Sequence, residues 1–189
     1  MDLYIGAIVE SENGQDVGTV ERVILDLASN EVTYYVVHSD TGRRRDFLVP
    51  AELADERERI LSLRIPSKEV EKLPDYLEFE YGVPPARSRA TTGGEGGPAP
   101  EREIAVPQKL PEDQTAELSR GEPVDCVDGE VGALEGVVVD ELTDEVTDLV
   151  VGVTRRRKSA RVPTAWASRL GPTRIQLQCS TPEVESLIR

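Results

Sequence analysis

The residue types that most often perform catalysis or bind metal are scarce in this chain. His38 is the only histidine, and Cys126 and Cys179 are the only cysteines. One histidine rules out most histidine-based catalytic and metal sites, and two cysteines are too few for a zinc cluster or a disulfide framework. A disulfide between the two is conceivable, although a cytoplasmic chain does not favour one. We expect no catalytic residue, no metal and no cofactor.

Carboxylates recur in matching pairs, Asp26 with Glu31 and Asp140 with Glu145. Paired carboxylates can support acid–base chemistry or bind a cation. Each pair flanks a predicted turn, however, where the aspartate caps the turn and the glutamate faces solvent, and this explanation is the stronger one. We therefore expect that the protein is not an enzyme.

The strongest charge signal is the basic run Arg155–Lys158. Residues 122–148 hold ten acids and no base, whereas residues 149–182 hold seven bases and no acid. Because guanidinium groups bind carboxylate and phosphate in a bidentate manner, the run predicts a projecting hairpin that docks an acidic protein surface or a phosphate-bearing partner. The competing explanation is that the acidic and basic halves neutralise each other within one barrel, with about 0–1 kcal/mol for each surface pair. Self-association between the acidic face of one molecule and the basic face of another is a third reading.

A second basic run occupies residues 43–45, with acids close behind it. The only tryptophan, Trp166, is expected to anchor either the core or an interface. The candidate docking residues are therefore Arg43, Arg44, Arg45, Arg155, Arg156, Arg157, Lys158, Arg161 and Trp166.

Composition limits the function classes further. The 189 residues include 36 acids and 22 bases, for a formal net charge of -14 at pH 7. This balance disfavours nonspecific nucleic-acid binding but leaves room for a local basic site. The sequence has no apolar run near the about 18–20 residues that span a membrane, and its first residues lack the features of a signal peptide. We expect a cytoplasmic protein that does not insert into a membrane.

The elements that position these residues come from an internal repeat. Residues 18–37, GTVERVILDLASNEVTYYVV, match residues 132–151, GALEGVVVDELTDEVTDLVV, at an offset of 114 with nine identities in 20 positions. The match extends outward, from Gly6 and Gly121 to Leu73 and Leu187. The chain is a tandem duplication.

The segment between the copies differs in composition. Residues 82–117 hold six prolines and five glycines, which predicts a flexible linker. The expected domains are residues 1–81, with nine bases and 18 acids (net -9), and residues 118–189, with nine bases and 12 acids (net -3).

Each copy has the pattern of an all-β domain. Short runs rich in valine, isoleucine and tyrosine are separated by turn residues such as Asn13-Gly14 and Asp128-Gly129. Residues 23–27 (VILDL) are apolar at nearly every position, which a small closed barrel with both faces covered would explain. Each copy then ends in a short predicted helix, after residues 67 and 181.

This succession of motifs resembles the PRC-barrel family, present twice. In each copy a Gly-x-x-Val segment is followed by a run that ends at Asp26 or Asp140, then by Glu-Val-Thr-x-x-Val-Val and, after a polar hairpin, by Val-Pro. The resemblance covers about residues 1–77 and 118–189. It implies an all-β fold of two tandem small barrels, each with a short C-terminal helix, joined by the linker.

The resemblance also implies a docking role. PRC barrels occur in the H subunit of photosynthetic reaction centres and in a maturation factor of the small ribosomal subunit, and no catalytic residue set carries over from either. We therefore expect a non-enzymatic scaffold or adaptor with an unidentified protein partner. The alternatives are a ribosome- or RNA-associated maturation factor, which Arg155–Lys158 favour and the acidic balance opposes, and a peripheral subunit of a reaction-centre-like membrane complex. Fold alone does not decide among them.

Overall fold

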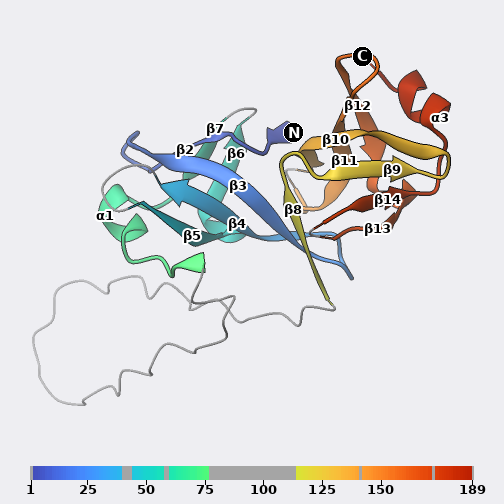
Figure 1. Ribbon diagram of the computed structural model, residues 1–189. Coiled ribbons are helices and arrows are strands. Elements are labelled where there is room, and N and C mark those ends of the chain that lie inside the picture. Colours follow the sequence, from blue (N-terminus) through green and yellow to red (C-terminus); the bar gives the residue numbers. More distant parts are fainter. Residues whose placement is uncertain are drawn as a thin grey trace, which may run out of the picture.

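The computed structural model describes residues 2–39, 44–57, 60–76, 114–140, 142–171 and 173–188. These residues form mostly strands, arranged in two seven-stranded sheets with a few short helices (Figure 1). The all-β fold class expected from the sequence is thereby confirmed. The central part of the expected linker, residues 82–113, lies outside the described residues.

The first sheet has the strand order β5-β4-β3-β2-β7-β6. Its strands are β2 (Ile8–Glu10), β3 (Asp16–Asp26), β4 (Val32–Ser39), β5 (Arg45–Pro50), β6 (Ala54–Arg57) and β7 (Ile60–Leu63). The 3-10 helix η1 (Ala51–Leu53) follows β5, and the helix α1 (Ser67–Val70) follows β7. Most neighbours are antiparallel, and β2 and β7 pair in parallel.

The second sheet repeats this plan, with the order β12-β11-β10-β9-β14-β13. Its strands are β9 (Pro123–Cys126), β10 (Gly129–Val139), β11 (Val146–Val153), β12 (Lys158–Pro163), β13 (Ala167–Arg169) and β14 (Ile175–Leu177). The 3-10 helix η2 (Thr164–Trp166) follows β12, and the helix α3 (Thr181–Ser186) follows β14. A capping box, in which Ser180 and Glu183 bind each other's backbone N–H groups, begins α3.

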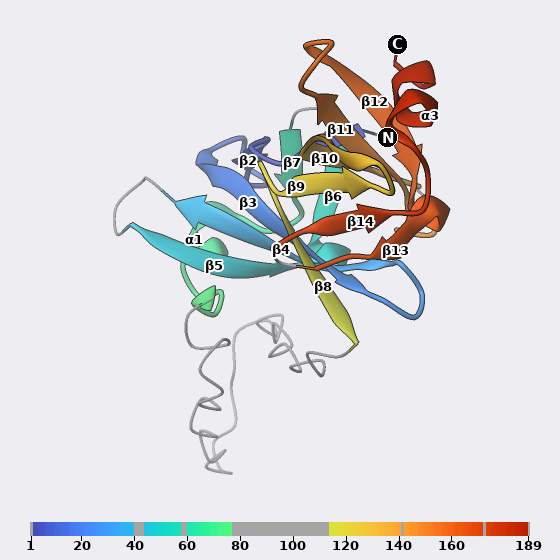
Figure 2. The same ribbon diagram turned by 45° about the vertical axis from the view of Figure 1, so that its right-hand side comes forward.

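The first strand of each copy joins the sheet of the other copy. Strand β1 (Asp2–Tyr4) pairs with β10, and strand β8 (Thr115–Ser119) pairs with β3. In Figures 1 and 2 the N-terminus accordingly lies beside the second sheet, while β8 runs along β3. Strand β8 begins before residue 118, at which we placed the second domain, and it belongs to the first sheet.

The exchange is reciprocal and follows a pseudo-two-fold axis. Leu3 pairs with Val137, and its counterpart Leu118 pairs with Val23, which is the counterpart of Val137 in the repeat. On the axis itself, Glu31 forms a bridge with its own counterpart, Glu145. The N–H of Val32 donates to Asp144 O at 3.0 Å, and the N–H of Val146 donates to Asn30 O at 2.9 Å. The two copies therefore pack as an isologous pair within one chain.

Two short turns carry the chain between the copies. Gly6 follows β1 with φ 102°, and Gly121 follows β8 with φ 84°. The N–H of Gly6 donates to Val20 O at 2.7 Å, and that of Gly121 donates to Leu134 O at 2.8 Å. Because glycine adopts positive φ without steric strain, each turn can reverse sharply from one sheet to the other.

Both copies share one hydrophobic core. A single buried cluster includes Leu3 and Leu118 together with strand residues from both sheets. A smaller cluster covers the outer face of the first sheet, where Tyr76 packs on Ile24, Val36 and Leu48. This second cluster explains why residue 24 is apolar between two inward-facing neighbours.

The expected closed barrels are not formed. In each described sheet, the two end strands, β5 with β6 and β12 with β13, do not pair with each other. The outer edge of β5 is covered by residues 74–75, through a Phe47–Asp75 bridge and a hydrogen bond from Leu48 N–H to Pro74 O at 3.0 Å. The edge of β12 is covered by an Ala160–Ile188 bridge. The segments after the short helices occupy the edges that barrel closure would need.

Candidate functional site

The basic run Arg155–Lys158 forms the tip of the β11–β12 hairpin, as the sequence predicted. The N–H groups of Arg156 and Arg157 donate to Val153 O at 3.1 and 3.0 Å, which closes the turn. Arg157 has φ 52°, a conformation that few residues other than glycine and asparagine adopt readily. Residues 154–158 are all exposed, and the hairpin projects near α3 and the C-terminus (Figure 1).

The four basic residues differ in their surroundings. Arg156 donates from Nε and Nη2 to Glu185 Oε2 of α3, at 3.1 and 2.9 Å, which links the hairpin to the helix. Its side chain stays 63% exposed, so solvent screens this pair and it contributes at most about 1 kcal/mol. Arg155 lies close enough to Asp128 to favour its ionised form; the pKa of Asp128 is lowered chiefly by the Thr181 N–H and further by this charge.

The equivalent run in the first copy is used differently. Arg45 donates to Asp75 Oδ1 at 2.7 Å and to the carbonyl oxygens of Val70, Glu71 and Leu73, each at 3.0 Å. This arginine therefore fixes the end of α1 against β5. Arg44 is exposed and has interactions of its own, and Arg43 lies outside the described residues. In the second copy Lys158 takes the place of Arg45 and is exposed.

The remaining two candidates lie apart from the hairpin tip. Arg161 on β12 is exposed and lines an open cavity of about 420 Å³, together with Asp148, Pro163 and residues 186–188. Trp166 in η2 is half-buried and packs against the shared core, and its carbonyl accepts a hydrogen bond from Gln178 N–H at 2.8 Å. The structure therefore brings Arg155–Lys158 together at one exposed hairpin, whereas Arg45 in the first copy is held in contacts with Asp75 and the end of α1.

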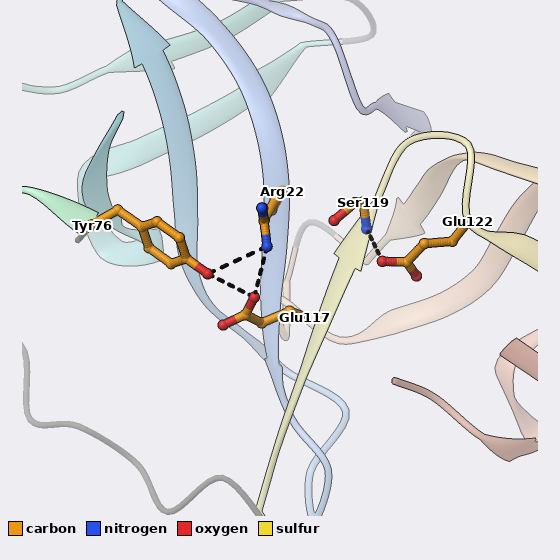
Figure 3. Close-up of polar contacts among 5 residues, drawn as sticks. All are labelled: Arg22, Tyr76, Glu117, Ser119 and Glu122. Carbon is orange, nitrogen blue, oxygen red and sulfur yellow. Dashed lines mark hydrogen bonds and ion pairs between the residues drawn. The ribbon is translucent and has the colours of Figure 1, made fainter. Parts of the chain in front are cut away.

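A polar cluster that the sequence did not indicate lies where β8 crosses the first sheet (Figure 3). Tyr76 donates its hydroxyl hydrogen to Glu117 Oε2 at 2.7 Å, and Arg22 pairs with the same oxygen at 3.2 Å. The Arg22 guanidinium also lies 5.4 Å from the centre of the Tyr76 ring. These contacts tie the exchanged strand to the outer face of the first copy.

Glu122 follows this strand in the turn toward β9. Its Oε1 accepts the Ser119 N–H at 2.9 Å, whereas Oε2 is buried and, among the residues that the structure describes, has no hydrogen-bond partner (Figure 3). Burial raises the pKa of Glu122. The repeat offered a signal here, because the counterpart of Glu122 in the first copy is Ala7.

The described residues show no grouping suited to a metal ion. No cluster of three or more histidine, cysteine, aspartate or glutamate side chains occurs among them. The single histidine, His38, pairs with Asp46 at 2.6 Å on the surface of the first sheet. Nor do the helices described here include one that is long and apolar enough to cross a membrane.

The described residues therefore define a β-rich protein built from two similar seven-stranded sheets. Residues 3–70, which make up most of the first copy, match the family model of the PRC-barrel domain. The match begins in the exchanged strand β1 and ends in α1, and it does not extend to the second copy. No curated protein matches the chain.

Proposed function

We propose that the chain is a non-enzymatic interaction scaffold in which both copies are PRC-type units and the second copy docks an acidic protein surface through its basic hairpin. The repeat supports the first part, since β9–β14 reproduce the order and pairing of β2–β7. The second part rests on one observation. Arg155, Arg157 and Lys158 project from a turn whose backbone is fixed by its own hydrogen bonds.

Three features make this hairpin suitable for docking. Its charges are exposed, so a partner meets them without first breaking a buried contact. Arg156 is already tethered to α3, which limits the motion of the tip and lowers the entropy cost of binding. Clustered cations also accelerate encounter with an acidic surface, an effect that added salt weakens.

The first copy presents a different surface. It carries net charge -9 over residues 1–81, and its Arg45 is held by Asp75 and by the end of α1. We therefore assign docking to the second copy and a supporting role to the first. Because the copies exchange strands, the first copy holds the second in a fixed orientation.

The experiment compares two variants with equal loss of charge. The hairpin variant carries Arg155→Gln, Arg157→Asn and Lys158→Gln, with asparagine chosen because it tolerates the positive φ of Arg157. The control variant carries Lys68→Gln, Lys72→Gln and Arg169→Gln, all at exposed positions away from the hairpin. Both proteins and the wild type are used to capture partners from lysate, with and without RNase, and captured proteins are then purified and titrated at several salt concentrations.

A partner that binds the wild type and the control, and that loses about tenfold or more in affinity with the hairpin variant, supports the proposal. Its affinity should also fall as salt rises. Loss of capture on RNase treatment would instead favour the RNA-associated role. Equal binding by all three proteins would remove the hairpin from the site.

A further inference from the structure

The two cysteines lie at a strand contact that occurs in both copies of the repeat. Cys126 ends β9, and Cys179 follows β14, the parallel neighbour of β9. The N–H of Val127 donates to Cys179 O at 3.0 Å. In the first copy Glu12 N–H donates to Ile65 O at 2.9 Å, so Ser11 and Ile65 are the counterparts of the two cysteines. The second copy thus has Cys126 in place of Ser11 and Cys179 in place of Ile65.

The two cysteines lie on adjoining, hydrogen-bonded backbone segments in the second copy. Both belong to the buried core cluster, and the residues are 7% and 8% exposed. Cysteines at adjoining positions of two hydrogen-bonded strands have backbones close enough for a disulfide to join them with little movement. A serine and an isoleucine pack adequately at this place in the first copy, so packing alone does not require two cysteines.

We propose that Cys126 and Cys179 form an intrachain disulfide under oxidising conditions, which fastens the start of α3 to the end of β9. The bond would form where the start of α3 already contacts the turn that follows β9. Thr181, the first residue of α3, donates from its N–H and its hydroxyl to Asp128 Oδ1, at 2.8 and 2.9 Å. The disulfide reinforces this junction, from which α3 reaches Arg156 through Glu185. The inference is independent of what the hairpin binds.

The step is an exchange with a small disulfide such as oxidised glutathione. One of the two thiols, written here as that of Cys179, first loses its proton and acts as a thiolate. It attacks one sulfur of the oxidant and releases one small thiolate. The Cys126 thiolate then displaces the second small thiol and forms the Cys126–Cys179 bond. Two protein thiols are oxidised, one small disulfide is reduced to two thiols, and these take up the two protons.

Burial makes this reaction slow near neutral pH. It raises the pKa of Cys126 to about 12 and also raises that of Cys179, so few thiolates exist at pH 7. The rate should therefore rise about tenfold for each pH unit between 7 and 9. Once formed, the bond closes a long loop between residues 126 and 179, which favours a persistent link over a rapidly reversing one.

The test uses the full chain, incubated with reduced or with oxidised glutathione. Free thiols are alkylated after unfolding and counted by mass spectrometry, and the thermal midpoint of each form is recorded. The single variants Cys126→Ser and Cys179→Ile carry the residues found at the same places in the first copy. These variants in reduced buffer report whether the substitutions themselves disturb the fold.

The expected result is a monomer that loses both free thiols together and gains about 5 °C or more in thermal midpoint. Neither single variant should show this gain. Two alkylatable thiols after prolonged oxidation at pH 9 would overturn the proposal. So would a product that holds only mixed or interchain disulfides, or an intrachain disulfide that leaves the thermal midpoint unchanged or lowers it.

Discussion

Substitution of Leu118 by alanine tests the strand exchange directly. Leu118 is fully buried on β8, opposite Val23 of β3. Replacing its isobutyl group by a methyl group loses about 0.8 kcal/mol for each methylene-sized unit, or about 2.4 kcal/mol in total. The cavity left between strands that cannot collapse adds about 1 kcal/mol. We expect the free energy of unfolding to fall by about 3–4 kcal/mol and the thermal midpoint by about 10 °C.

The location of the effect is more decisive than its size. Native-state hydrogen exchange should show weakened protection in β3, around Arg22–Asp26, because those residues pair with β8. The symmetric variant Leu3→Ala serves as the control, and it should weaken protection in β10 around residues 136–138 instead. Weakened protection of β10 in the Leu118→Ala protein, with β3 unaffected, would refute the exchange. A loss below about 1 kcal/mol would refute the burial argument.

Two further results are expected. Cleavage at a protease site introduced into residues 82–111 should leave the two fragments associated until they unfold, because β1 and β8 join the copies by hydrogen bonds. Size-exclusion chromatography of the cleaved protein measures this association. Elution of two separate fragments at micromolar concentration would contradict the prediction. Glu122→Gln should raise the free energy of unfolding at pH 7, because the folded-state pKa of Glu122 is raised and its ionised form is therefore disfavoured by folding. This gain should disappear as the pH falls below about 4, where the carboxyl is protonated in both states, and denaturant titrations at pH 4 and pH 7 measure it.

The repeat was sufficient to predict two β-rich copies with matching strands, but it predicted neither the open sheets nor the strand exchange. Equal residues at equal spacing identify equal strands, so β2–β7 and β9–β14 follow from the pattern. The partner of β1 does not follow from it, because Val23 and Val137 offer the same apolar face to Leu3. In the structure the turn at Gly6 carries the chain from β1 in the second sheet back to the first sheet, where the Gly6 N–H donates to Val20 O.

Some features of the candidate site could likewise be predicted from the sequence, and others could not. Exposure of Arg155–Lys158 follows from a charged run between two apolar strands. The use of Arg45 does not, because it depends on carbonyl groups at the end of α1 that are remote in sequence. The partner of Tyr76 is likewise remote, since Glu117 reaches it only after β8 crosses into the first sheet. Sequence pattern therefore predicts local exposure, whereas the polar contacts between copies require the three-dimensional arrangement.

The strand exchange also fixes how the two copies are oriented relative to each other when they bind a partner. The sequence left open whether the two domains pack as a pseudo-dimer or are loosely tethered, in which case avidity would depend on the reach of the linker. In the structure both ends of that segment lie against the first sheet. Tyr76 packs on its outer face, and Leu27 N–H donates to Gln114 O at 2.9 Å. The chain passes between copies through the turns at Gly6 and Gly121 instead. The strands therefore set the orientation of the hairpin relative to the first copy, and a partner that contacts both copies meets one pre-organised surface.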